Sequence, residues 1–251
     1  MRLDKMLSDS GFGTRSQVRE FIHSGRVAVN GNPVKDISLR VENPETVTFD
    51  KHPIFYSAYS YYMLNKPAGV VTATSDKLQK TVMDLITVPK RRDLFPVGRL
   101  DKDTEGLLVI TNNGQLAHRL LAPGKHVEKK YLAWISGELD TEKITAFENG
   151  LDIGDETMTH PAKLKLVDGI CKLEMECDSN LVLTEVRITE GRYHQIKRMF
   201  EAVDCKVEHL KRISMGPVEL DGELSPGEYR KLTDEEIKSI CIDQTGSDLF
   251  D

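Results

Sequence analysis

The sequence lacks the features of a membrane protein, a disulfide-bonded secreted protein and a zinc protein. Its most continuous apolar stretch, residues 107–110, is far shorter than the roughly 18 to 20 residues that cross a bilayer, and residues 1–10 contain no hydrophobic signal core. No two of its four cysteines have Cys-x-x-Cys spacing, so we expect neither disulfides nor structural zinc. These absences predict a cytoplasmic protein whose cysteines are reduced and mostly packed in the interior. The cysteines are Cys171, Cys177, Cys205 and Cys241.

Several familiar catalytic motifs are also missing. The chain contains no P-loop, no Gly-x-Gly-x-x-Gly, no His-Glu-x-x-His and no Gly-x-Ser-x-Gly. Its seven histidines are dispersed, and no spacing among them suggests metal ligands. We therefore expect chemistry that needs neither a bound nucleotide nor a metal ion, and no cofactor.

The composition is that of a globular protein with an uneven charge distribution. With 251 residues, 39% hydrophobic and 29% charged, the chain is long enough for one large domain and a small one. The net charge is −6, but residues 217–251 carry ten acidic and three basic side chains, so the acidity lies at the end of the chain. Basic residues outnumber acidic ones in residues 2–40 and 76–102. These local excesses keep nucleic acid as a candidate partner.

The first fifty residues predict a compact unit of two helices and a hairpin. Residues 2–10 place apolar side chains on one helical face. Residues 14–17, Thr-Arg-Ser-Gln, have the form of a capping box for a second helix, which Gly25 ends. Residues 26–34 alternate around Asn-Gly, which is typical of a hairpin.

The second helix carries Arg15 and Arg19 one turn apart. Taken alone, this pair is typical of a solvated helix face. However, RLDKML followed by G-x-x-TRS, then by I-x-x-G-x-V-x-VNG, resembles the S4 RNA-binding domain over residues 1–50. The resemblance implies that the second helix and the hairpin bind folded RNA, with Arg15 and Arg19 as contacts. It implies no reaction, because S4 domains occur in binding proteins as well as in enzymes.

A second domain must then supply any chemistry. We place a linker at residues 51–60, a second domain at 61–237 and an acidic tail at 238–251. Within the second domain the pattern predicts strands and helices in irregular order, which favours an α+β fold with a mixed, largely antiparallel sheet. The expected strands are 61–65, 107–111, 131–136, 172–176 and 183–189, and the expected helices are 115–121, 141–149 and 194–203. A capping box at 233–236 predicts a short helix, followed by a tail that frays after about Ile242.

Four segments of the second domain combine charged residues and a turn with an apolar strand or helix. They read LNKPAG, GRLDKDTEGLL, EKKYL and EGRYHQIKRMF. Each has an ordinary explanation by itself, as a turn, a capping residue or a solvated helix. In this order after an S4 domain, they resemble the pseudouridine synthases of the RsuA branch, and the similarity covers residues 1–237. MLNKP, HRLLAP and GRYHQIKRMFEAV are most similar to members that modify small-subunit (16S) rRNA, with members acting on large-subunit (23S) rRNA as the alternative.

The resemblance implies catalytic roles for three residues. Asp101 matches the essential aspartate, and Tyr131 matches the tyrosine that packs on the target base and assists proton transfer. Lys197 matches a basic position that pairs with the aspartate, although the adjacent Arg198 is an alternative partner. Four further residues are implied to contact RNA. They are Lys66, Arg99, Arg192 and Arg198.

The implied activity is isomerisation of one flipped-out uridine to pseudouridine, with 16S rRNA or the assembling small subunit as partner. Cleavage of N1–C1′ and formation of C5–C1′ need no redox step, and an ionised Asp101 suits either attack at C1′ or removal of a sugar proton. We expect a monomer that binds no membrane and no small-molecule cofactor. A non-catalytic ribosome-assembly protein is the alternative class, but it has no chemical need for Asp101, Tyr131 and Lys197 together.

Overall fold

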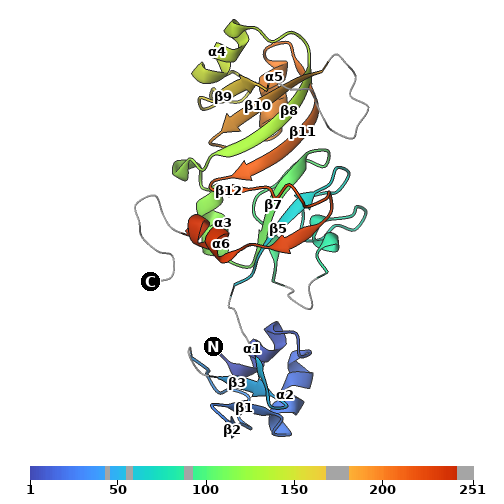
Figure 1. Cartoon of the computed structure of the whole chain (residues 1–251), viewed down its shortest axis with the longest axis vertical. Helices are drawn as coiled ribbons and strands as arrows, with labels where there is room; N and C mark the ends of the chain where they lie inside the picture. Colours follow the sequence, from blue (N-terminus) through green and yellow to red (C-terminus); the bar gives the residue numbers. More distant parts are fainter. Residues whose placement is uncertain (43–45, 55–58, 88–92, 168–180, 242–251) are drawn as a thin grey trace. The chain divides into compact units, whose positions relative to one another are not determined.

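The computed structural model describes residues 1–42, 46–54, 59–87, 93–167 and 181–241. The chain forms two compact units (Figure 1). The first comprises Met1–Tyr59 with Thr87–Leu94, and the second comprises Ser60–Ile86 with Phe95–Asp251. Within the described ranges, no helix has the length and apolar character that a membrane crossing requires.

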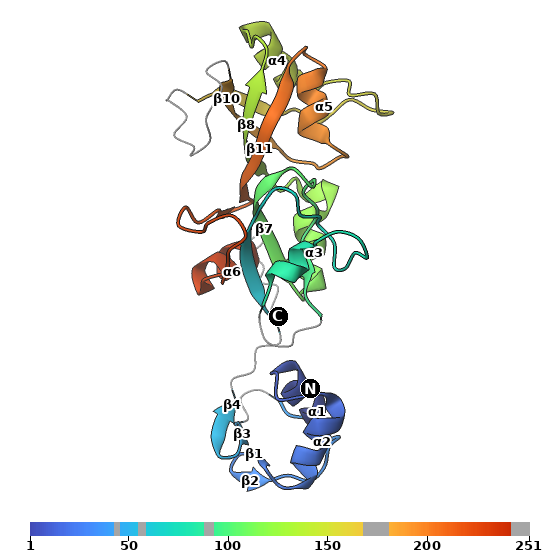
Figure 2. The same ribbon diagram turned by 90° about the vertical axis from the view of Figure 1, so that its right-hand side faces the viewer.

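The first unit contains two helices and a four-stranded antiparallel sheet, visible at the blue end of the chain in Figure 2. Thr14 and Gln17 form the predicted capping box. Thr14 N–H donates to Gln17 Oε1 at 2.9 Å, and Gln17 N–H donates to Thr14 Oγ1 at 3.4 Å. Asn30 and Gly31 adopt φ values of 50° and 81°, as a two-residue hairpin turn requires. The predicted helix, helix, hairpin order is therefore confirmed. The elements are α1 (Leu3–Asp9), α2 (Arg15–His23), β1 (Val27–Val29), β2 (Asn32–Pro33), β3 (Val47–Phe49) and β4 (His52–Ile54), with strand order β2-β1-β3-β4.

The second unit is organised around a sheet of nine described strands. Its main path runs β13-β5-β7-β11-β8-β10-β9, with β12 beside β11 and β6 beside β7. β7 and β11 are parallel, and the other pairs are antiparallel, so the α+β fold with a mixed, largely antiparallel sheet is confirmed. The strands are β5 (Tyr61–Lys66), β6 (Phe95–Pro96), β7 (Glu105–Thr111), β8 (Lys129–Ser136), β9 (Lys163–Leu166), β10 (Val182–Ile188), β11 (Lys206–Met215), β12 (Val218–Glu219) and β13 (Tyr229–Lys231).

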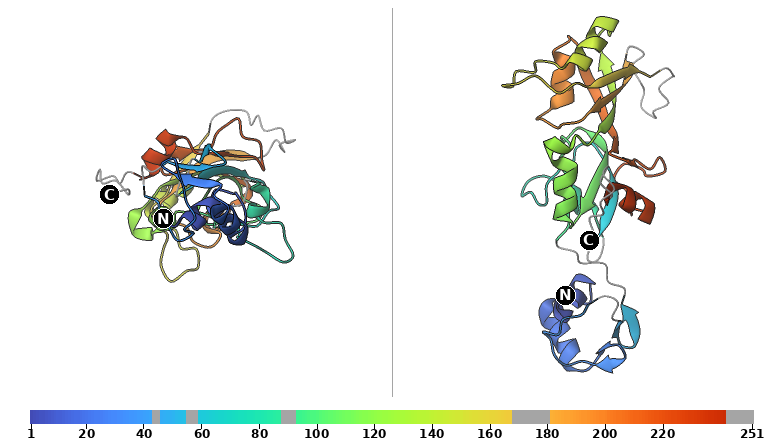
Figure 3. Two further views of the ribbon diagram at one scale, coloured as in Figure 1. Left: turned by 90° about the horizontal axis from the view of Figure 1, so that it is seen from below. Right: turned by 90° about the vertical axis from the view of Figure 1, so that its left-hand side faces the viewer.

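Helices cover this sheet and supply its core. Figures 2 and 3 show α3 and α5 along the same side of the sheet. Leu116 and Leu120 of α3 pack with Met63 and Val109 of the strands. The ring of Phe147 in α4 lies 5.0 Å from that of Phe200 in α5. The helices are α3 (Gly114–Leu121), α4 (Thr141–Asn149), α5 (Gln195–Glu201) and α6 (Asp234–Cys241), with 3₁₀ turns at η1 (Val82–Leu85) and η2 (Pro123–Lys125).

Most predicted elements of the second unit are confirmed, with shifts at their ends. The helices at 115–121, 141–149 and 194–203 and the strands at 61–65, 107–111, 131–136 and 183–189 are present. Hydrogen bonds between Thr233 and Glu236 open the predicted short helix. Residues 172–176 and the tail after Ile242 lie outside the described residues, as do the two cysteines in residues 168–180. The other two cysteines are buried.

The sequence pattern missed β11, the ten-residue strand at the centre of the sheet. Its charged residues interrupt the alternation that marks a strand. One of them, Arg212, is only 2% exposed, because β7 and β8 flank the strand on both sides.

Candidate active site

Two adjoining hollows of about 90 and 790 Å³ lie on the second unit. We call them together the groove. Their shared lining comes from the loop before β7, from β8, and from the turn between β10 and α5. The residues common to both hollows are Arg99, Leu100, Asp101, Tyr131, Gly191, Arg192 and His194. Segments that are far apart in sequence therefore meet at one concave surface, which is the usual setting of a binding or catalytic site.

The loop that carries Asp101 is held from several directions. Gly98 has φ 75°, and a Cβ there would lie 2.8 Å from a methyl group of Leu121. Leu100 is buried, and the hydroxyl of Thr72 both accepts from its N–H at 3.2 Å and donates to its carbonyl at 2.7 Å. Thr104 N–H donates to the Asp101 carbonyl at 3.1 Å, which closes a turn around Asp101. The backbone thereby fixes where this carboxylate lies.

Lys66, which the resemblance implied to be an RNA contact, has its ammonium buried against the backbone of the same loop. Its side chain is fully buried, with 0% exposure. Its ammonium donates to the carbonyl oxygens of Pro67 at 3.0 Å, Lys102 at 3.2 Å and Thr104 at 2.8 Å. Burial lowers the pKa of Lys66 to about 8, against the opposing charges of Glu105 and the two loop aspartates. A phosphate cannot reach an ammonium in this position, because three carbonyls surround it.

Asp101 faces two basic side chains from the turn and helix after β10. Its Oδ1 lies 3.5 Å from His194 Nε2, and its Oδ2 lies 3.6 Å from Lys197 Nζ. The carboxylate is 29% exposed, so it remains accessible from the groove. Lys197 is therefore the member of the Lys197–Arg198 pair that lies beside Asp101.

Lys197 is shared with a second carboxylate that the sequence did not single out. Its Nζ donates to Asp103 Oδ1 and Oδ2 at 2.6 and 2.7 Å, which is shorter than its separation from Asp101. Partial burial raises the pKa of Asp103, but the hydrogen bond and charge of Lys197 outweigh it and lower the pKa overall. Asp103 is 72% exposed and does not line the groove. Its position two residues after Asp101 in the loop was the only sequence signal for this contact.

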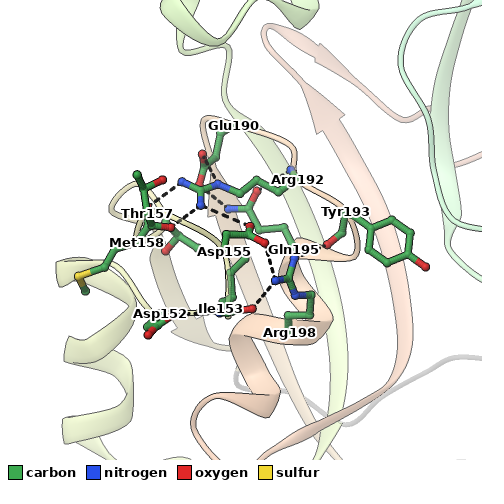
Figure 4. A network of polar contacts seen from close by, with 12 residues as sticks. Asp152, Ile153, Asp155, Thr157, Met158, Glu190, Arg192, Tyr193, Gln195 and Arg198 are labelled. Carbon is green, nitrogen blue, oxygen red and sulfur yellow. Dashed lines mark hydrogen bonds and ion pairs between the residues drawn. The ribbon is translucent and has the colours of Figure 1, made fainter.

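Arg192 and Arg198 hold an adjacent loop, residues 152–158, against the turn (Figure 4). Arg192 donates to the carbonyls of Thr157 at 2.6 Å and Met158 at 2.7 Å, and to Glu190 at 3.0 Å. Arg198 donates to Asp155 at 2.6 Å, to the Tyr193 carbonyl at 3.1 Å and to the Ile153 carbonyl. The structure thus commits both guanidinium groups to internal contacts. These contacts give the two arginines a structural role that the sequence did not predict.

The remaining predicted residues lie as follows. Tyr131 of β8 is 7% exposed and lines both hollows of the groove. Arg99 is exposed in the groove wall, and its guanidinium has no partner in the described part of the chain. On α2 of the first unit, Arg15 is exposed without a described partner, whereas Arg19 lies 3.6 Å from Asp4. Arg99 and Arg15 are therefore the predicted arginines whose charges face solvent unpaired within the described residues.

Comparison with protein families assigns a model to each part of the chain. The RNA pseudouridylate synthase model matches residues 60–202, and the S4 domain model matches residues 1–47. A crystal structure of a pseudouridylate synthase superposes with a TM-score of 0.65 and 35% identity, covering 96% of this chain and 99% of that one.

Individual relatives match almost end to end. An uncharacterized RNA pseudouridine synthase of Bacillus subtilis, YtzG, is 46% identical over 240 residues, which are 94% of this chain and 97% of that protein. The ribosomal small subunit pseudouridine synthase A of Vibrio parahaemolyticus is 38% identical, over 96% of this chain and 99% of the relative. The protein of the same name in Escherichia coli is 36% identical, over 96% of this chain and 100% of the relative.

Proposed function

Since the chain belongs to the RNA pseudouridylate synthase family, we propose that it isomerises a uridine of small-subunit (16S) ribosomal RNA to pseudouridine. Two relatives whose names specify the ribosomal small subunit match 96% of the chain, and the S4 domain adds an RNA-binding unit. The observation that carries the chemistry is the position of Asp101. It lies in the groove wall beside Lys197 and His194, with Tyr131 lining the same hollow.

In this proposal Asp101 is the catalytic carboxylate. It acts in its ionised form, either by attack at C1′ of the target uridine or by removal of a sugar proton that is later returned. In both routes the N1–C1′ bond breaks, C5 bonds to C1′, the C5 proton is lost and N1 gains a proton. The cation of Lys197, 3.6 Å away, stabilises that ionised form. Lys197 also donates to Asp103, whose exposed carboxylate lies outside the groove.

The groove receives the target base after it leaves the RNA stack. Flipping a nucleotide costs a few kcal/mol, which contacts at the site must offset. Tyr131, which lines the groove, packs on the uracil ring, and Arg99, unpaired among the described residues, contacts the RNA backbone. On the first unit, Arg15 and Arg19 of α2 bind a second part of the same RNA.

The test compares the wild type with Asp101→Asn and Asp103→Asn on two RNA substrates. Each protein is incubated with partly assembled small-subunit particles and, separately, with large-subunit rRNA. Pseudouridine is mapped by carbodiimide-dependent primer-extension stops. We expect a new stop only in small-subunit RNA, with turnover reduced by more than about 1000-fold in Asp101→Asn. Asp103→Asn is the matched control, because the same change is made in the same loop outside the groove, and it keeps turnover within about tenfold.

Other outcomes would change the proposal in defined ways. A stop only in large-subunit RNA would keep the reaction and replace the substrate. Tight RNA binding by the wild type with no stop in either RNA would instead indicate a ribosome-assembly protein. Full turnover by Asp101→Asn would remove Asp101 from the mechanism.

A further inference from the structure

Two buried cations lie beside Tyr131 at the floor of the larger hollow. Arg212 of β11 pairs directly with Tyr131 of β8 in the antiparallel register, so their side chains share one face of the sheet. Lys129 precedes Tyr131 by two residues on β8 and points to the same face. Lys129 is 7% exposed and Arg212 is 2% exposed, yet both line the larger hollow.

Both Lys129 and Arg212 have N–H donors for which the described residues provide no acceptor. Arg212 Nε donates to the Leu107 carbonyl at 2.8 Å, but its Nη2 is buried without a hydrogen-bond partner. Lys129 Nζ makes one hydrogen bond, to the Val127 carbonyl at 2.9 Å, and neither cation has a carboxylate within ion-pair distance in the described part of the chain. Burial, and next the charge of Arg212, lower the pKa of Lys129 to about 8, although Glu190 opposes the shift.

The buried ammonium of Lys66 provides a comparison, because all of its hydrogen-bond donors have acceptors within the protein. Its ammonium has three carbonyl acceptors, one for each N–H. Lys129 and Arg212 instead line the larger hollow and keep donors that no described residue uses, and leaving buried charged donors unused is costly. The arrangement fits a pair of donors that is completed by an anionic ligand.

We infer that Lys129 and Arg212 bind one phosphodiester group of the RNA substrate at the floor of the larger hollow, beside Tyr131. This inference rests on the proposed function, because it makes RNA the ligand. The pair offers donors only, which matches the acceptor oxygens of a phosphate. The carbonyl oxygens of a uracil ring also accept hydrogen bonds, but they are neutral and bind a cation less strongly than the charged oxygens of a phosphate do. The site therefore holds the backbone of the nucleotide whose base packs on Tyr131, or of its neighbour.

The test measures RNA affinity separately from turnover. Arg212→Met and Lys129→Met are made in an Asp101→Asn background, and binding to partly assembled small-subunit particles is measured over a series of salt concentrations. Lys211→Met is the matched control, since Lys211 neighbours Arg212 on β11 but does not line the groove. We expect each test variant to bind about tenfold more weakly, and the slope of log affinity against log salt to be less steep by about 0.7, as for one lost phosphate contact.

A structural role for the pair predicts a different result. Thermal melting of all variants shows whether each is folded, and Lys129→Met keeps the test decisive if Arg212→Met does not fold. A folded variant with wild-type affinity and salt slope, or with weaker binding at an unchanged slope, would overturn the inference. The pseudouridine assay on the wild type is read independently. Its failure would remove the proposed reaction, whereas the salt slopes would still decide whether these two cations bind RNA phosphate.

Discussion

Replacing Lys66 by Met separates a structural lysine from an RNA-binding one. The substitution keeps most of the apolar stem and removes the ammonium that donates to Pro67, Lys102 and Thr104. The bond to the Thr104 carbonyl is buried, so that acceptor is left without a donor at a cost of about 1–3 kcal/mol. The other two carbonyls are partly buried and regain water, and loss of the buried charge offsets part of the penalty. We expect the free energy of unfolding at pH 7 to fall by about 1–3 kcal/mol.

The lowered pKa of Lys66 adds a pH dependence to this prediction. Burial brings the pKa in the folded protein to about 8, from an ordinary value of 10.5. Between these values the unfolded chain holds a proton that the folded protein releases, so the contribution of this group to stability rises with pH. The rise is at most about 1.4 kcal/mol per pH unit. Met cannot titrate, so the gap in stability between wild type and Lys66→Met should widen from pH 7 to about pH 9.5.

Urea unfolding at the two pH values provides the measurement. Trp134 of β8 is the one tryptophan in the chain and is 3% exposed, which makes its fluorescence a probe of the second unit. Lys102→Met serves as the control, because Lys102 is exposed in the same loop and its loss should leave stability unchanged. If Lys66→Met instead unfolded like the wild type and bound RNA more weakly, Lys66 would be an RNA contact and its assignment as a support of the loop would be wrong.

Three further substitutions test other parts of the structure. Arg198→Met removes the bonds to Asp155 and its loop, so we expect faster cleavage within residues 152–158 in limited proteolysis and a loss of about 1–2 kcal/mol; wild-type resistance would contradict this role. Arg15→Ala should weaken RNA binding and reduce its salt slope by about 0.7 without changing the melting temperature, whereas unchanged affinity would exclude this contact. Gly106→Ala should destabilise the protein by about 3 kcal/mol or more, because φ is 97° and the Arg212 backbone blocks a Cβ; a normally folded variant would refute that packing.

Local signals in the sequence sufficed for many elements and for the family. The capping box at Thr14 and the Asn30–Gly31 turn act within four residues, so their geometry follows from neighbouring side chains alone. The helix at 141–149 and the short helix after Thr233 follow from similar signals. The motif around Asp101 also pointed to the loop that forms the groove wall.

Tertiary structure decided which charged residues face the groove and which support it. Lys197 and Asp103 are 94 residues apart in the chain, and Arg212 and the Leu107 carbonyl are 105 apart. These contacts exist because β11 inserts between β7 and β8, an order that no local pattern encodes. In the sequence, Lys66 and Arg99 are both single cations within a motif. In the structure, Lys66 is buried against three carbonyls, whereas Arg99 faces the groove. Residue type sets the charge, but only the packing of distant strands sets its burial and its partners.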